Sequence, residues 1–265
     1  MDLIEINEQF LTLEQGQIFV KQWKYKNTVH LNKSPIILFH ESLGSVALWR
    51  DFPEKLALAT ERDVIAYDRL GFGQSSALID PPDFNFVAKE AEETLPILLK
   101  QFGLNHFIVM GHSVGGGMAS ICAALYPQQC KALITESAQS MVEEETLDGI
   151  RRAKVNFSNE KFLSRLAKYH ADKTQWVLDA WTETWLSPEF KKWDLDAYLK
   201  RVHCPLLAIH GEADEYATIA QPKRFVDLAQ GDTELCLIEA CGHFPHQEKQ
   251  EQVLQSIQQF LKHID

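Results

Sequence analysis

The sequence lacks the features that mark several large classes of protein. None of its apolar runs approaches the ~20 residues that span a bilayer, and acidic residues stand near the N-terminus where a signal peptide has basic ones. It has no run of lysine and arginine, and a formal net charge of -11 over 265 residues opposes binding to nucleic-acid phosphates. We therefore expect a cytoplasmic protein that binds neither membranes nor nucleic acid.

Cysteine is scarce as well. The five cysteines include no Cys-x-x-Cys pair, and their odd number leaves at least one thiol unpaired in any intramolecular scheme. Reduced, buried thiols are the expected state. The hydrophobic share of 45% and the charged share of 24% are ordinary for a globular enzyme, and the length suits one α/β domain that carries an insertion.

The sequence does contain an alternation of strand and helix patterns. Strands are predicted at residues 10–13, 17–25, 35–40, 63–68, 107–110, 130–135, 204–210 and 234–239. Helices are predicted between them at 45–59, 83–102, 114–126, 222–229 and 247–264. Pro96 lies inside one of these helices, where its ring predicts a bend. Such alternation predicts an α/β fold with a mostly parallel, doubly wound sheet, whose functional loops follow the carboxyl ends of the strands.

The alternation stops in residues 137–202, which contain no convincing strand pattern. Helices are predicted there at 146–157, 159–170 and 174–186, and Ser187-Pro188-Glu189 has the composition of a further helix start. We therefore predict a core made of residues 1–136 and 203–265, with residues 137–202 inserted as an all-helical cap.

Ser113 lies in a Gly-x-Ser-x-Gly turn that follows the predicted strand at 107–110. Such a turn needs small residues at Gly111 and Gly115, because the serine is held in a strained backbone conformation with strand and helix almost touching. A serine hydroxyl is a poor nucleophile near neutral pH, so it requires a histidine as base and an acid to orient that histidine.

Candidates for both partners follow later strands. Asp214 comes after the strand at 204–210, and His243 comes after the strand at 234–239. The order in the chain is therefore Ser113, then Asp214, then His243. Alternatives that the residues leave open are Glu212, Glu215 or Glu136 as the acid and His246 as the base.

Four motifs together resemble the α/β-hydrolase fold family, in its form with a helical cap, from about residue 36 to the C-terminus. They are Asp-Arg-Leu-Gly-Phe-Gly-Gln-Ser at 68–75, Gly-His-Ser-Val-Gly at 111–115, Gly-Glu-Ala-Asp at 211–214 and Gly-His-Phe at 242–244. The resemblance implies that Ser113 is the nucleophile, His243 the general base and Asp214 its orienting acid. It also implies an oxyanion hole made by the amides of Val114 and Ser42.

The sequence departs from the family pattern beside this oxyanion loop. Relatives usually have His-Gly where this chain has His40-Glu41. A carboxylate near a developing negative charge opposes catalysis unless it points away, is paired with Arg69 or another cation, or is protonated. We expect a structural rather than a catalytic role for Glu41, at the edge of the substrate pocket.

The predicted insertion holds four of the six tryptophans, at positions 176, 181, 185 and 193. Trp181 and Trp185 are four residues apart and therefore share one helix face. We expect most of the tryptophans to seat the insertion on the core, and Trp181 and Trp185 to roof an apolar substrate pocket over Ser113.

These observations predict a serine hydrolase that cleaves a small or medium apolar carboxylic ester or lactone through an acyl-enzyme. Carbon–carbon bond hydrolysis or a lyase step on the same triad, and a ligand receptor with little turnover, are the alternatives. The glycines at 71 and 73 do not complete a dinucleotide motif, and the histidines at 210, 243 and 246 fit a triad better than a metal site, so no cofactor or metal is expected. A small-molecule substrate is the expected partner of a monomer or homodimer.

Overall fold

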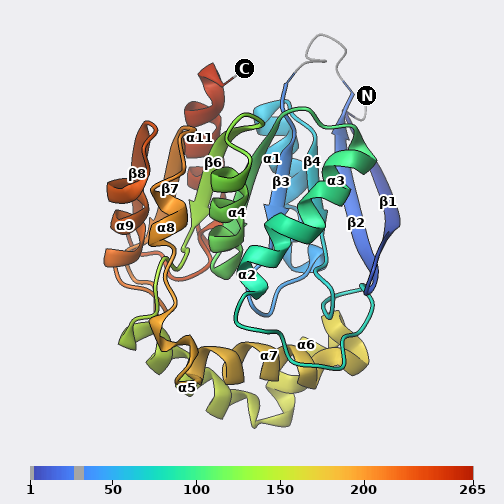
Figure 1. Ribbon diagram of the computed structural model, residues 1–265, viewed down its shortest axis with the longest axis vertical. Helices are drawn as coiled ribbons and strands as arrows, with labels where there is room; N and C mark the ends of the chain where they lie inside the picture. Colours follow the sequence, from blue (N-terminus) through green and yellow to red (C-terminus); the bar gives the residue numbers. More distant parts are fainter. Residues whose placement is uncertain (1–2, 27–32, 265) are drawn as a thin grey trace.

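The computed structural model describes residues 3–26 and 33–264, and within them one eight-stranded sheet forms the centre of the molecule (Figure 1). The strands are β1 (Ile4–Leu13), β2 (Gly16–Tyr25), β3 (Ile36–Phe39), β4 (Val64–Tyr67), β5 (Phe107–His112), β6 (Cys130–Glu136), β7 (Leu206–Gly211) and β8 (Thr233–Ile238). Their spatial order is β1-β2-β4-β3-β5-β6-β7-β8. The β1–β2 and β2–β4 pairs are antiparallel and the others parallel, which confirms the predicted mostly parallel sheet.

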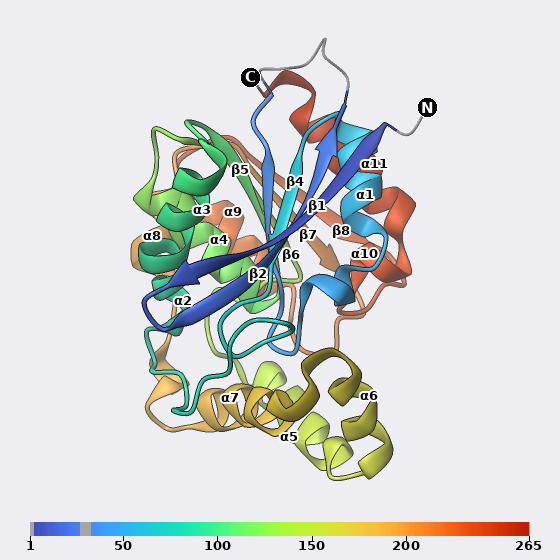
Figure 2. The ribbon, with the colours of Figure 1, turned by 90° about the vertical axis from the view of Figure 1, so that its right-hand side faces the viewer.

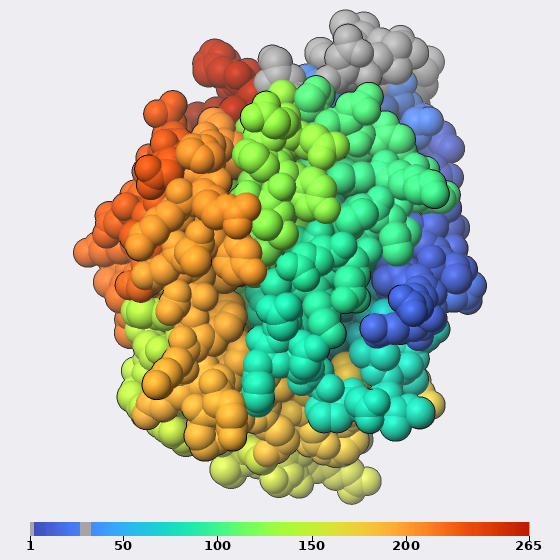
Figure 3. Space-filling view, in the orientation of Figure 1, coloured from blue at the N-terminus to red at the C-terminus, as the bar shows by residue number. Residues whose placement is uncertain are grey.

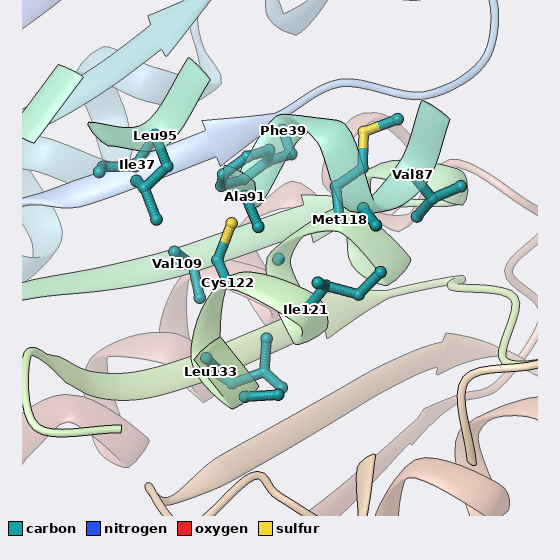
Figure 4. Packing of buried hydrophobic residues seen from close by; sticks show 14 of the residues in the cluster. Ile37, Phe39, Val87, Ala91, Leu95, Val109, Met118, Ile121, Cys122 and Leu133 are labelled. Carbon is teal, nitrogen blue, oxygen red and sulfur yellow. The ribbon is translucent and has the colours of Figure 1, made fainter. Parts of the chain in front are cut away.

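Helices cover both faces of the sheet (Figure 2). On one face lie α1 (Phe52–Thr60), α10 (Pro245–Glu248) and α11 (Gln250–Phe260), and on the other lie α2 (Phe86–Lys89), α3 (Leu95–Phe102), α4 (Val114–Leu125) and α9 (Ala220–Leu228). Successive residues of β3 alternate between the two resulting cores. Ile37 and Phe39 pack with Met118 of α4 (Figure 4), while Ile36 and Leu38 pack on the opposite face. Burial on both faces explains the continuous apolar runs of the central strands.

Several predicted helices are broken in the structure. Residues 45–59 form a 3₁₀ turn, η2 (Val46–Trp49), and then α1, because Arg50 has a φ of 55° and Pro53 stands at the start of the next helix. Residues 247–264 are similarly divided into the end of α10, α11 and η6 (Leu261–His263), with Lys249 at φ -135° between the first two. Single long helices at these two places were therefore wrong.

The predicted bend at Pro96 takes the form of a π-helical turn. This turn, η3 (Glu90–Thr94), lies between α2 and α3, and Pro96 falls in the first turn of α3. A proline ring removes one hydrogen bond of a continuous helix, and a π-turn just before it accommodates that loss.

The insertion between β6 and β7 is helical, as predicted. It contains α5 (Glu144–Phe157), α6 (Glu160–His170), η4 (Ala171–Lys173), α7 (Thr174–Leu186), η5 (Phe190–Lys192) and α8 (Asp196–Leu199). Helices α5 to α7 lie across the carboxyl ends of the parallel strands, and in the space-filling view the insertion closes that end of the molecule (Figures 1 and 3). The helix start predicted at 187–189 leads only to the short η5, and Leu199 of α8 packs in the same core as α4.

The domain boundaries at 136 and 203 stay predictions. Within the described residues, no helix has the length and the apolar composition needed to cross a membrane.

Candidate active site

Ser113 lies on the sharp turn that joins β5 to α4. Its backbone has a φ of 56° and a ψ of -127°, a conformation that residues with a side chain rarely adopt. The neighbouring glycines make the turn possible: a Cβ at Gly111 would lie 2.0 Å from the Gly115 carbonyl oxygen, and one at Gly115 would lie 2.2 Å from the Phe39 carbonyl oxygen. The close approach of strand and helix predicted from the sequence is therefore present.

The same contact places the start of α4 against the loop after β3, which carries Ser42. Val114 is the first residue of α4, so its N–H has no acceptor within the helix. Ser42 lines the same pocket as Ser113. This arrangement is compatible with the predicted oxyanion hole, and the assignment of Val114 and Ser42 stays a prediction.

Asp214 and His243 come from the loops that follow β7 and β8 and meet side chain to side chain. His243 Nδ1 lies 2.9 Å from Oδ1 and 2.8 Å from Oδ2 of Asp214, and the Asp214 side chain is fully buried. The Tyr216 N–H also donates to Asp214 Oδ1, at 2.8 Å. A carboxylate accepts hydrogen bonds, so this contact places the proton on Nδ1 and leaves the lone pair on Nε2.

Burial by itself would raise the pKa of Asp214, but the hydrogen bond and charge of His243 and the Tyr216 amide hold that pKa below its usual value. Asp214 is therefore ionised near neutral pH. It can orient the imidazole of His243 and stabilise the positive charge that forms when this ring takes a proton.

The other candidate acids have different contacts. Glu215 Oε2 accepts the main-chain N–H of His243 at 3.3 Å, and Glu212 is exposed. Glu136 binds His246 instead, with Oε2 2.7 Å from Nδ1 and Oε1 2.5 Å from the backbone nitrogen. Among the alternatives, the carboxylate that contacts the His243 ring is thus that of Asp214.

His246, the alternative base, lies outside the pocket that contains Ser113. Its ring is buried against Trp49, with ring centroids 4.8 Å apart, and its Nδ1 is bound to Glu136. His243 and Ser113, by contrast, line one pocket together. The geometry therefore joins the predicted serine, histidine and aspartate at one edge of the sheet.

The pocket has a volume of about 210 Å³ and mostly apolar walls. It is lined by Glu41, Ser42, Leu43, Ser113, Gln139, Thr146, Ile150, Phe157, Trp181, Trp185, Tyr216, His243 and Phe244. Trp181 and Trp185 are among these lining residues, and their part in substrate binding stays a prediction. Trp193 Cη2 lies 3.6 Å from the position of a Cβ built on Gly117 of α4, so this tryptophan packs on the core.

Gln139 is a site residue that the sequence did not reveal. Ser113 Oγ donates a hydrogen bond to Gln139 Oε1 at 3.1 Å, so the hydroxyl is turned toward the loop after β6. Gln139 is 3% exposed and lines the pocket. The available signal was its position directly after the strand that neighbours β5, since loops at that edge converge on the nucleophile.

The Glu41 carboxylate lies beside His112 rather than Arg69. Its Oε2 is 3.7 Å from His112 Nδ1, whereas Arg69 Nη2 donates to the Glu41 backbone carbonyl at 2.9 Å. Of the arrangements that the sequence left open for Glu41, the contacts therefore favour another cation than Arg69 as its neighbour. Burial alone would raise the pKa of Glu41, but the neighbouring His112 and His40 lower it to about 2. An ionised carboxylate thus lines the pocket near Ser113.

Within the described residues, His112, Glu136 and His246 bring potential metal-ligand atoms within 4.8 Å of one another. Their hydrogen bonds already account for most of these atoms, because His246 Nδ1 is bound to Glu136 and His112 Nε2 is bound to the His243 carbonyl. These contacts favour a hydrogen-bonded cluster over a metal centre.

Ser113, Asp214 and His243 follow β5, β7 and β8 of this sheet, which is the arrangement expected of the α/β-hydrolase fold. The family model described as alpha/beta hydrolase fold matches residues 34–172. The chain therefore belongs to this family, which confirms the resemblance seen in its motifs.

Among curated relatives, the chain is 34% identical over 120 residues to human 1-acylglycerol-3-phosphate O-acyltransferase ABHD5. The aligned segment covers 43% of this chain and 32% of that protein. It thus matches only about a third of the length of that relative. A putative esterase/lipase 1 of Mycoplasma pneumoniae is 25% identical over 205 residues, covering 69% of this chain and 75% of the relative.

Among solved structures, 2-hydroxy-6-oxo-6-phenylhexa-2,4-dienoate hydrolase from Rhodococcus superposes with a TM-score of 0.77 at 16% identity, over 98% of this chain and 99% of that one. At this identity the likeness shows the fold alone.

Proposed function

We propose that the protein is a serine hydrolase that cleaves a small or medium apolar carboxylic ester or lactone through an acyl-enzyme. Ser113 is the nucleophile, His243 the general base and Asp214 the acid that orients it. The observation that carries this proposal is the His243–Asp214 pair, with contacts of 2.8 and 2.9 Å, in the pocket that also holds Ser113. The names of the curated relatives, an O-acyltransferase and a putative esterase/lipase, support it.

The reaction begins when substrate enters and the Ser113 hydroxyl leaves Gln139 to donate to His243 Nε2. His243 takes the proton as Ser113 Oγ attacks the carbonyl carbon, and Asp214 stabilises the resulting imidazolium. The amides of Val114 and Ser42 would then face the oxyanion, each contributing about 2.7–4 kcal/mol to the transition state. His243 returns the proton to the departing alkoxide, and a water molecule repeats these steps to release the acid.

The pocket favours a neutral substrate. Its walls are mainly aromatic and aliphatic, and its volume of about 210 Å³ suits a short acyl chain. A second cavity of about 580 Å³ shares Ser42, Trp181 and Trp185 with it and offers room for the rest of a larger substrate.

The charge of Glu41 separates the leading proposal from its alternative. Carbon–carbon bond hydrolysis is the reaction suggested by the name of the Rhodococcus structure, whose dienoate substrate is an anion. Glu41 lines the pocket and the buried His112 beside it does not, so the Glu41 carboxylate is the charged group that a substrate meets, and it disfavours a second carboxylate there. An uncharged ester or lactone is therefore favoured over an anionic dienoate.

The test is a panel of p-nitrophenyl esters and lactones with wild type and Ser113→Ala. Removal of a triad nucleophile lowers kcat on the order of 10⁶-fold, so the variant should fall to background. Ser120→Ala is the matched control, because the Ser120 hydroxyl is buried in α4 and donates to the Gly116 carbonyl of the same helix. Ester turnover that survives in Ser113→Ala would refute the assignment of the nucleophile.

A further inference from the structure

We propose that His112 is a positioning residue: as an imidazolium paired with Glu41, it holds the main chain of His243 in place beside Ser113. This role rests on the function proposed above. His112 is the last residue of β5 and directly precedes Ser113. Its ring is fully buried, with its centroid 5.0 Å from that of His243. It therefore links the strand that presents the nucleophile to the loop that presents the base.

The link is a hydrogen bond of 2.7 Å between His112 Nε2 and the carbonyl oxygen of His243. A carbonyl oxygen only accepts hydrogen bonds, so Nε2 must carry a proton. If His112 were neutral, its Nδ1 would then carry a lone pair.

This lone pair would face an anion. Glu41 Oε2 lies 3.7 Å from Nδ1, and among the described residues Nδ1 has no hydrogen-bond partner. A lone pair and a carboxylate repel each other, and burial strengthens that repulsion because little water screens it. A proton on Nδ1 converts the repulsion into attraction. The geometry thus favours an imidazolium paired with ionised Glu41.

The other charged groups around His112 leave this pairing intact. Glu136, on β6, is the second carboxylate of the cluster, and its oxygens accept hydrogen bonds from His246 of α10. His243 itself is paired with Asp214. Glu41, on the loop after β3, is therefore the remaining carboxylate for His112.

The pairing gives Glu41 a structural role in the loop after β3. A charged donor makes a stronger hydrogen bond than a neutral one, so the imidazolium holds the His243 carbonyl more firmly. The carboxyl group packs against Gly44, where an added Cβ would lie 2.3 Å from Glu41 Oε2, so the glycine leaves room for it.

The kinetic test compares His112→Leu, which has no donor, with His112→Gln, whose amide can reach the position of Nε2. A catalytic group displaced by about 1 Å costs on the order of 10²-fold in rate, so His112→Leu should lower kcat by about that factor with KM nearly unchanged. His112→Gln should recover at least about tenfold of this loss. Equal kcat in the two variants, or wild-type kcat in His112→Leu, would overturn the proposal.

A second measurement does not depend on turnover or on the folding of His112→Leu. In protein labelled with ¹⁵N-histidine, NMR assigns the His112 signals by comparison with His112→Gln. Both ring nitrogens of His112 should carry protons at pH 7 in wild type, and Glu41→Gln should lose the proton on Nδ1. A single protonated nitrogen in wild type would refute the ion pair. If esters are not turned over but both protons are present, the proposed function fails while the ion pair stands.

Discussion

Replacing Asp214 by asparagine should disable the base without disturbing the fold around it. Asp214 Oδ1 accepts the Tyr216 N–H at 2.8 Å, and Oδ2 lies 2.8 Å from His243 Nδ1. In Asp214→Asn the amide oxygen can keep the Tyr216 contact, which turns the amide N–H₂ toward Nδ1. His243 must then accept at Nδ1 and carry its proton on Nε2, so it has no lone pair for the Ser113 hydroxyl.

The wrong tautomer in a Ser-His-Asp triad costs about 10⁴-fold in kcat, which corresponds to about 5.4 kcal/mol of transition-state stabilisation. The assay is hydrolysis of a short-chain p-nitrophenyl ester at pH 7, with circular dichroism to verify the fold. Glu215→Gln is the control: Glu215 Oε2 accepts the main-chain N–H of His243 at 3.3 Å, and the amide oxygen of glutamine can keep that bond. A loss of less than tenfold in Asp214→Asn, or an equal loss in Glu215→Gln, would refute the reasoning.

Three further predictions concern stability and specificity. The pKa of Glu41 falls from 4.5 to about 2 on folding, so ionised Glu41 adds at most about 3 kcal/mol to the free energy of unfolding above pH 4.5, and this stability is lost as the pH falls toward 2. Glu41→Gln should make the free energy of unfolding, measured with urea, depend less on pH in this range. An unchanged pH dependence would count against the ionised state. Truncating Trp181 and Trp185 to alanine should shift the preferred acyl chain length upward, and an unaltered preference would remove them from the pocket wall. Gly115→Ala should lower the free energy of unfolding by about 2–3 kcal/mol, because the new Cβ would lie 2.2 Å from the backbone. Gly117→Ala, whose Cβ would have its nearest contact at 3.4 Å, should leave the free energy of unfolding unchanged or raise it by up to about 1 kcal/mol. Similar losses in both variants would contradict this.

The sheet, and the positions of Ser113, Asp214 and His243 at its edge, were predictable because their sequence signals are local; the catalytic roles of these residues stay predictions. A strand buried on both faces appears as a continuous apolar run such as Ile36–Phe39. The order of strands and helices then brings Asp214 and His243 to the edge that carries Ser113. The contact between the two side chains follows from this topology.

Other features depend on packing that the sequence pattern does not carry. The break at Arg50 interrupts a helical periodicity that runs through it, and only the backbone, with a φ of 55°, reveals it. The partner of Glu41 is His112 because β5 ends beside the loop after β3. Gln139 likewise contacts Ser113 only through the fold of the loop after β6.

The central claim is that Ser113 is made nucleophilic by His243. It is tested most directly by treating the protein with a fluorophosphonate probe and mapping the adduct by mass spectrometry. We predict one adduct per chain, on Ser113, and a rate of labelling that falls by orders of magnitude in His243→Ala. An adduct on another residue, or equally fast labelling of Ser113 without His243, would contradict the account.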